Sequence, residues 1–485
     1  MAAALLVPLA AAAAPARPRA AALPLAPCQL GSDTSPLRAD ARCGTLEVPE
    51  DWSRPEGRKL RLRVAVVAAE ASRPAPDPVY VLAGGPGQAI TDAFPALAAG
   101  FARVARDRDV VLVDQRGTGG SGKLSCPDVP EPARGEELSE PEIRRRVRAC
   151  AAALSTRADL LQYGTDAFVR DLDAVRAALG HERVNLVGFS YGTRAALVYL
   201  RTFPGRVRAL VLDAVAPMQL VVAGWFERDA QHALDALFAR CEADAACRKA
   251  HPALRADFAA LVARLAKGPA RTAVRDPWSG ERTELEFGLD HLRSVVLAMS
   301  YASESAALLP PLVSAAARGD LEPLAGAYRL SAADVESQIA RPLQFSVLCS
   351  EDVPFLPEEP VEAEQGRYLG RSARDAFRGV CADWPKRPVA ASWHDPVRSD
   401  VPALLLSGEA DPVTPPAWAN LLLRDLPNAR HLVLAGEGHG AFLRGCVPEL
   451  VAGFLGAGTA SGLDAACVER IRPAPPFLDA NGGAP

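Results

Sequence analysis

The chain has 485 residues, enough for two or three domains or for one large α/β domain with insertions. Hydrophobic residues make up 49% of it and charged residues 23%, so the chain can bury a sizeable core. The formal net charge is −4 and both signs are spread along the chain, which argues against a nucleic-acid partner or a charged membrane surface.

The first 27 residues are rich in alanine and proline and are typical of an export signal. A short apolar stretch leads into small residues that offer cleavage options, although no Lys or Arg precedes it. The stretch is too short and too alanine-rich for a membrane span. We therefore expect residues 1–27 to be a leader, the protein to be exported (periplasmic or extracellular), and no integral membrane span.

The ten cysteines are even in number and fall as sequential neighbours. None forms a C-x-x-C pair or has a histidine at zinc-finger spacing, so metal binding is disfavoured. In an exported protein we expect disulfides, whereas a cytosolic protein would keep ten reduced cysteines. Sequence alone does not fix the connectivity, and our expectation is sequential pairing: Cys28–Cys43, Cys126–Cys150, Cys241–Cys247, Cys349–Cys381 and Cys446–Cys467.

The first part of the chain alternates short apolar strands with helical stretches. Residues 44–70 alternate in places and predict antiparallel strands. The later elements are predicted as buried strands at 78–83, 109–114, 184–187 and 207–213, with a helix at 167–179. This alternation predicts an α/β fold with a largely parallel sheet and helices on both faces.

The pattern changes between residues 217 and 395, which are mostly helical and show no clear strand–helix alternation. We expect this segment to be an inserted helical cap. Alternation resumes with a strand at 402–408, a helix near 416–424, a strand at 431–434 and a final helix. The predicted organisation is a leader (1–27), a first core part (28–216), a helical cap (217–395) and a second core part (396–485).

The strongest local signal is Gly188-Phe189-Ser190-Tyr191-Gly192, which lies between a predicted strand and a predicted helix. In that context G-x-S-x-G is a nucleophile elbow, a sharp turn that exposes the serine hydroxyl at the top of a sheet. The flanking glycines leave room that a side chain would fill. Without these flanks the pattern would more often be an ordinary turn, so Ser190 also needs a histidine and a carboxylate.

A serine nucleophile needs a base and a group that orients the base. In α/β hydrolases these follow in the chain order Ser, Asp or Glu, His, each after a strand. Asp411 follows the strand at 402–408, and His439, alone among seven histidines, has both the order and the loop context. Asp213 and Glu409 stay open as alternatives for the acid.

Acyl transfer also needs N–H donors for the developing oxyanion. The backbone N–H of Tyr191 directly follows the nucleophile, and Gly84-Gly85-Pro86-Gly87 follows an early strand. We expect Tyr191 and Gly85 to supply the two donors, although the glycine segment also fits a plain tight turn. This chemistry requires no metal and no cofactor.

Together, these motifs resemble those of the prolyl-aminopeptidase-like serine peptidases. The resemblance also includes Asp114–Gly119, Asp411–Pro415, and Gly438-His439-Gly440 followed by Cys446. Within these peptidases the chain is most similar to the exported tripeptidyl-aminopeptidase group, over about residues 42 to 470. The resemblance implies a serine aminopeptidase that acts on peptide substrates. Ala83 departs from the His that many relatives carry before Gly-Gly-Pro-Gly, which weakens a narrow proline specificity.

The resemblance also implies an anion that binds the free α-ammonium of the substrate. Cys349-Ser350-Glu351-Asp352 looks like the acidic segment that follows a cysteine in these relatives. It implies Glu351 as the amine anchor, with Asp352 as the second candidate. A solvated acidic turn is the competing interpretation.

Other functions fit parts of the sequence. Gly117–Gly122 contains G-x-G-x-x-G and is nearly a P-loop, but Leu124 stands where Ser or Thr would bind Mg²⁺ and no helix clearly follows. An esterase or lipase would use the same triad, because fold does not fix function. A non-catalytic binding protein would keep the hydrolase scaffold without its catalytic activity. The aminopeptidase is our main hypothesis, and the carboxylesterase or lipase is the alternative.

Overall fold

The computed structural model describes residues 23–33, 35–126, 129, 139–276, 279–356, 368–370, 372–479 and 481–483, without the side chains of 332–337 and 372. Most of the predicted leader lies outside these residues. The last five residues of the predicted leader, 23–27, are described. Leu23 donates its N–H to the carbonyl of Ala178 at 3.3 Å, and the first strand begins at Ala26. Leu23 and Leu25 join the apolar core, whereas Pro24, Ala26 and Pro27 are exposed, and the end of the leader stays a prediction.

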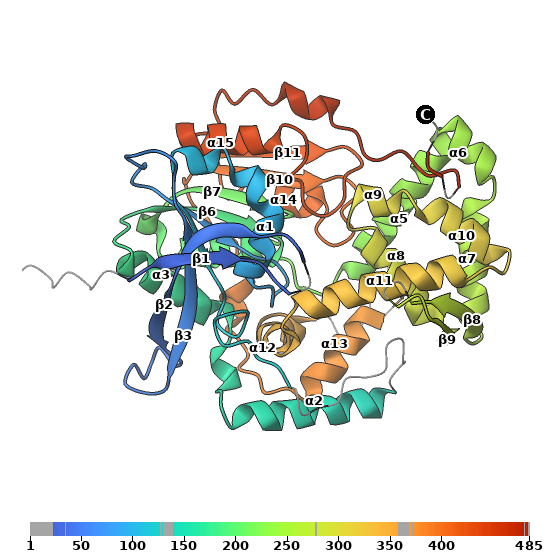
Figure 1. The fold of residues 1–485 in the computed structure, drawn as a ribbon, viewed down its shortest axis with the longest axis horizontal. Helices are drawn as coiled ribbons and strands as arrows, with labels where there is room; N and C mark the ends of the chain where they lie inside the picture. The colour runs from blue at the N-terminus through green and yellow to red at the C-terminus, as the bar shows by residue number, and fades with distance from the viewer. Residues whose placement is uncertain are drawn as a thin grey trace, which may run out of the picture.

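A mostly parallel sheet organises the molecule (Figure 1). In the described residues it has nine strands, ordered β1-β2-β3-β5-β4-β6-β7-β10-β11. Their bounds are β1 Ala26–Leu30, β2 Ala39–Pro49, β3 Lys59–Val67, β4 Val79–Leu82, β5 Val110–Val113, β6 Val184–Phe189, β7 Val207–Asp213, β10 Ala403–Gly408 and β11 Ala429–Leu434. The β1–β2, β2–β3 and β3–β5 pairs are antiparallel and the other pairs are parallel, which confirms the predicted fold class.

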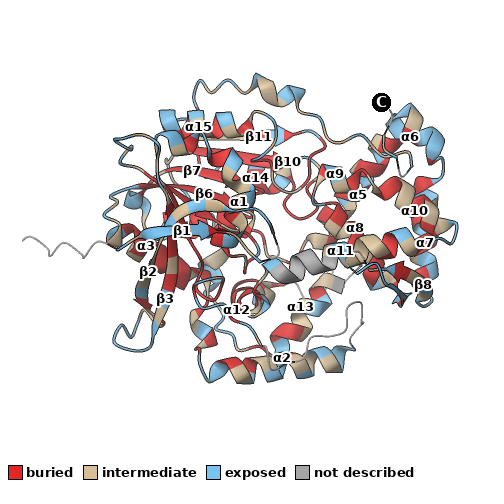
Figure 2. Cartoon of the chain, in the orientation of Figure 1, coloured by how far each residue is buried: buried red, intermediate tan, exposed pale blue. Residues whose placement is uncertain are grey.

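Helices cover both faces of this sheet, and the buried residues form one apolar cluster on each face (Figure 2). Along β4, Tyr80 and Leu82 join one cluster while Val79 and Val81 join the other, as the two-residue period of a strand requires. Burial on both faces is why these strands read as continuous apolar runs. The covering helices are α1 Ile90–Phe101, α3 Thr165–Ala178, α4 Tyr191–Thr202, α14 Pro416–Leu422 and α15 Val447–Ala457.

The segment between β7 and β10 is mainly helical, as predicted, and much of it forms a lobe beside the sheet (Figure 1). Its helices are α5 Phe226–Ala243, α6 Ala245–Ala250, α7 Leu254–Leu265, α8 Leu289–Met299, α9 Ser303–Ala306, α10 Leu309–Ala317, α11 Glu322–Gln338, α12 Arg341–Glu351 and α13 Ser372–Asp383. The lobe has an apolar core of its own. We refer to this inserted segment as the cap.

Several elements of the structure were not predicted, among them β1, α1, a hairpin in the cap and helix α2. The cap contains an antiparallel hairpin, β8 Ala270–Arg275 and β9 Arg282–Phe287, in which exposed charged residues alternate with Val274, Leu285 and Phe287, which are buried. Helix α2, Glu140–Ser155, belongs to the first core part in sequence but packs against α13 of the cap. An ion pair of 2.7 Å between Arg144 and Asp383 joins the two helices.

All five predicted disulfide pairs are present, and they bond all ten cysteines. Cys28–Cys43 joins β1 to β2, and Cys349–Cys381 joins α12 to α13. Such bonds persist in oxidising compartments, so they are consistent with export. Within the described residues, no helix combines the length and the apolar character that a membrane crossing needs.

A buried ion pair fixes the loop after β5 to helix α3. The Arg116 guanidinium donates to Asp171 through Nε at 2.7 Å and Nη2 at 2.5 Å, and both side chains are 0% exposed. Arg116 also donates through Nη1 to the carbonyls of Glu50 and Gln162, at 2.7 and 2.8 Å. The hydrogen bonds of this guanidinium therefore hold together the three segments that contain Glu50, Gln162 and Asp171.

Replacing Asp171 with Ala should lower the free energy of unfolding by about 3–5 kcal/mol, because the charge of Arg116 stays buried without its partner. Urea unfolding at pH 7, followed by circular dichroism with the disulfides intact, measures the change. Glu449→Ala is the matched control, since its ion pair with Arg103 (3.0 Å) is about half exposed on both sides. It should cost less than about 1 kcal/mol. Equal losses in both variants would contradict the assignment.

Candidate active site

Ser190 lies at the predicted sharp turn, between the end of β6 and the start of α4. Its backbone has φ 53° and ψ −121°, a strained conformation for a residue with a side chain, and its N–H donates to the carbonyl of Asp213 at 2.9 Å. A Cβ at Gly188 would overlap the backbone of Gly192, and one at Gly192 would overlap the backbone of Leu82. The strand, turn and helix of the predicted elbow are confirmed.

Asp411 and His439 meet at the ends of two neighbouring strands, β10 and β11. His439 Nδ1 lies 2.8 Å from Asp411 Oδ2. The Asp411 side chain is 0% exposed and its Oδ1 accepts the N–H groups of Val413 and Thr414, at 2.9 and 2.8 Å. These bonds fix the carboxylate in the orientation that the imidazole contacts.

The electrostatics of this pair favour a charged histidine. Burial opposes charge on both groups, but their mutual attraction outweighs it. The pKa of Asp411 is therefore lowered from its ordinary value, and the pKa of His439 is raised. An imidazolium that forms here when the ring takes up a proton is stabilised by the carboxylate beside it.

The two alternative acids hold the loop around His439 instead of its imidazole. The Asp213 carboxylate accepts the backbone N–H groups of Ala441 and Phe442, each at 2.9 Å, and burial raises the pKa of Asp213 to about 6. Glu409 accepts the N–H of Gly436 at 2.9 Å. The geometry therefore selects Asp411 as the partner of His439.

Two further residues at the site have no counterpart in the sequence prediction. Thr414 Oγ1 donates to Asp411 Oδ2 at 2.8 Å and lies 3.2 Å from His439 Nδ1. A threonine three residues after the acid is the sequence signal that was available for it. Tyr301 of the cap packs its ring against the His439 imidazole, with 5.0 Å between the ring centroids. No local pattern links Tyr301 to a histidine so far along the chain.

The predicted oxyanion segment lies directly beside the elbow. It follows β4, which pairs with β6, and a Cβ at Gly84 would lie 3.2 Å from the Cβ of Ser190. Gly85 has φ 110°, a conformation that favours glycine. The carbonyl of Gly87 accepts the N–H of Ala340 of the cap at 2.9 Å. The loop that carries Gly85 therefore lies against Ser190 through Gly84, and the oxyanion role of Gly85 and Tyr191 stays a prediction.

The two predicted amine anchors are buried, which does not fit the solvated-turn alternative. Asp352 binds Arg194 Nη1 through both oxygens, at 2.8 and 2.9 Å, and accepts the N–H of Val222. Glu351 accepts the N–H and the hydroxyl of Thr165, at 2.6 and 2.8 Å. Because protein groups engage both carboxylates and solvent does not reach them, the geometry does not fit a direct contact with a substrate ammonium.

Glu351 instead connects to the elbow through a buried hydrogen-bond network. The Thr165 hydroxyl lies 2.6 Å from the hydroxyl of Tyr191, which also accepts a hydrogen bond from Gln115 Nε2 at 3.2 Å. Burial raises the pKa of Glu351 to about 8, although the bonds from Thr165 act to lower it. The network fixes the side chain of the residue that follows Ser190.

The glycine-rich segment after β5 is a closed loop that serves the core. The buried Asp114 carboxylate accepts the N–H groups of Thr91 and Gly120, each at 2.9 Å, and a Cβ at Gly119 would collide with it. Residues 123–126, which follow the loop, are not helical, whereas a dinucleotide fingerprint opens a helix. Among the described residues, no cluster of His, Cys, Asp or Glu has the arrangement of a metal site.

A strained serine after one parallel strand, with a buried His–Asp pair after two others, is the arrangement of an α/β-fold serine hydrolase. Family models agree: the alpha/beta hydrolase fold matches residues 77–281, and the TAP-like protein family matches residues 367–467. The protein is an α/β hydrolase with a TAP-like C-terminal region.

Three curated relatives refine this class. Serine protease Hip1 of Mycobacterium tuberculosis is 27% identical over 476 residues, 91% of this chain and 90% of the relative. Tripeptidyl aminopeptidase of Streptomyces lividans is 34% identical over 189 residues, 36% of this chain and 35% of the relative. Carboxylesterase B of Mycobacterium tuberculosis is 28% identical over 468 residues, 88% of this chain and 86% of the relative. With the fold and the site, these similarities define a serine hydrolase of the peptidase type.

The pH dependence should reveal the His439–Asp411 pair. If neutral His439 is the active form, kcat/KM should rise with pH around a midpoint above about 6.5, because Asp411 raises the pKa of His439. Asp411→Asn removes the negative charge, so the midpoint should move to lower pH and kcat should fall by about 10⁴-fold. Initial rates on a nitrophenyl ester between pH 5 and 9 measure both effects. An unchanged midpoint in the variant would refute the pairing.

Proposed function

We propose that this protein is an exported serine aminopeptidase that releases short peptides or single residues from peptide N-termini through an acyl-enzyme. The observation that carries the proposal is the 2.8 Å bond between His439 and Asp411 at the same sheet edge as the strained Ser190. The full-length similarity to a serine protease and the partial similarity to a tripeptidyl aminopeptidase support the peptidase part. The disulfides support export.

In the proposed mechanism, His439 is the base and Ser190 the nucleophile. Nδ1 of His439 is engaged by Asp411, so Nε2 takes the proton of the Ser190 hydroxyl as its oxygen attacks the peptide carbonyl. His439 then donates this proton to the leaving amine, and the acyl group stays on Ser190. A water molecule, deprotonated by the same imidazole, attacks the ester, and the proton returns to Ser190 when the acid product leaves.

The backbone N–H groups of Gly85 and Tyr191 are proposed to bind the oxyanion in both steps. Both belong to fixed segments: the glycine loop lies against the elbow, and the Tyr191 side chain is fixed by Thr165 and Gln115. Donors held in place before the reaction lower its barrier without a reorganisation cost. In this account Glu351 supports the elbow through Thr165.

An esterase is the second candidate, and one observation favours it. The chain is similar over most of its length to a carboxylesterase as well as to a serine protease. The same triad serves either reaction, because an ester and an amide differ only in the atom that leaves.

Two substrates that share the same acyl part, one with a free N-terminus and one with an acetylated N-terminus, distinguish these functions. We expect the purified protein to cleave a tripeptide nitroanilide with a free amine at least ten times faster, by kcat/KM, than the N-acetylated form. Ser190→Ala, which removes only the nucleophilic oxygen, is the control for contaminating peptidases. Rapid turnover of N-blocked nitrophenyl esters without any nitroanilide cleavage would overturn the peptidase and support the esterase.

A further inference from the structure

One turn of the cap contacts the proposed catalytic histidine. Tyr301 lies between α8 and α9, and its carbonyl accepts the backbone N–H of His439 at 2.7 Å. Its ring meets the His439 imidazole in a T-shaped arrangement, with 5.0 Å between the centroids and 65° between the planes. A Cβ at Gly438 would overlap the Tyr301 carbonyl, so glycine is required for this close approach.

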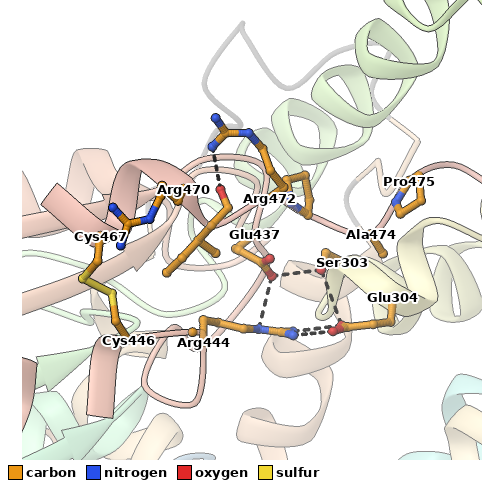
Figure 3. A pocket seen from close by; sticks show the side chains of 13 residues that line it. Ser303, Glu304, Glu437, Arg444, Cys446, Cys467, Arg470, Arg472, Ala474 and Pro475 are labelled. Carbon is orange, nitrogen blue, oxygen red and sulfur yellow. Dashed lines mark hydrogen bonds and ion pairs between the residues drawn. A yellow bond between two sulfur atoms is a disulfide. The ribbon is translucent and has the colours of Figure 1, made fainter. Parts of the chain in front are cut away.

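The turn that carries Tyr301 is also locked to the histidine loop by charged side chains (Figure 3). Ser303 Oγ donates to Glu437 Oε2 at 2.9 Å, and the same oxygen lies 3.2 Å from Arg444 Nε. Arg444 Nη2 reaches back to Glu304 Oε2 at 2.8 Å. Since Ser303 and Glu304 start α9 while Glu437 and Arg444 flank His439, the network holds the two segments in one register.

Beside these contacts, Tyr301 is partly exposed as a residue, while burial around its hydroxyl raises the pKa of that group. Tyr301 is 39% exposed, one of the few large apolar residues of the described chain with that exposure, whereas the His439 side chain is 13% exposed. A large ring packed against the imidazole lies close to the atoms that His439 serves.

We propose that Tyr301 binds the leaving group and makes the enzyme prefer substrates with an aromatic residue after the scissile bond. The inference rests on the proposed function, because it requires that His439 protonates the leaving amine. That amine must come within hydrogen-bond reach of the imidazole, about 3 Å, so the residue that carries it lies beside the ring packed there. Aromatic rings attract one another in edge-to-face or offset geometry, beyond the effect of burial.

A role in which Tyr301 only supports His439 makes a different prediction, because the reaction has two steps. Substrates that share an acyl part give the same acyl-enzyme, whose hydrolysis no longer involves the leaving group. A leaving-group contact therefore affects acylation alone, and by an amount that depends on the leaving group. A support role affects acylation and deacylation alike.

The test compares kcat/KM for two peptides with the same acyl part, one ending in glycinamide and one in phenylalaninamide after the scissile bond. In Tyr301→Ala we expect the value for the phenylalaninamide peptide to fall about tenfold more than that for the glycinamide peptide. Tyr301→Phe should keep the preference. Deacylation, measured as kcat on the nitrophenyl ester of the same acyl part, should stay within about twofold. Ile143→Ala, a substitution on α2 at a similar exposure of 37%, should change none of these values.

Equal losses for both peptides, a matching loss in deacylation, or no loss at all would overturn the proposal. If Tyr301→Ala does not fold, Tyr301→Leu keeps most of the side-chain volume without the aromatic ring. The same comparison of kcat/KM for the two peptides then tests the proposal. If the wild type cleaves no peptide, the proposed function fails on its own. Esters with ethyl and benzyl alcohol as leaving groups then test Tyr301 separately, since His439 protonates those alcohols as well.

Discussion

The hydrogen-bonded pair of His439 and Asp411 is the interaction on which the site depends. The carboxylate is fully buried, and burial alone would favour its neutral form. It stays charged because the imidazole and two backbone N–H groups compensate for the lost water. Strand pairing makes this possible: β10 and β11 are parallel neighbours, so the loops that follow them converge at the edge where the elbow after β6 also lies.

The cap is fixed to both loops that flank Ser190. Its α8–α9 turn binds the histidine loop through Tyr301, and the residue that precedes α12, Ala340, donates a backbone hydrogen bond to Gly87 in the glycine loop. A rigid-body opening of the whole cap would break both sets of hydrogen bonds. The structure therefore favours a site whose walls are set before the substrate arrives, which lowers the entropy cost of orienting it.

Local patterns predicted much of this arrangement. The glycines around Ser190 leave no room for any other residue, and the strand before Asp411 is buried along its whole length. The strand before His439 is at the sheet edge and buries Leu432 and Leu434, so each signal has a direct steric or apolar cause. Sequential cysteine pairing was correct for all five bonds. The β8–β9 hairpin was missed although exposed charged residues alternate there with the buried Leu285 and Phe287, because the whole segment was interpreted as a helical insertion. The burial of Glu351 and Asp352 depends on Thr165 and Arg194, which lie in distant helices, and no local pattern shows such partners.

Direct observation of the acyl-enzyme tests the central claim, that Ser190 is the nucleophile and His439 its base. The protein is mixed with a nitrophenyl ester of slow turnover, quenched in acid within the first turnover, and analysed by intact mass and peptide mapping. The account predicts a stoichiometric mass increase equal to the acyl group, located on Ser190 and strongly reduced in His439→Ala. An adduct on another residue, or substrate turnover without any adduct under conditions where deacylation limits the rate, would contradict it.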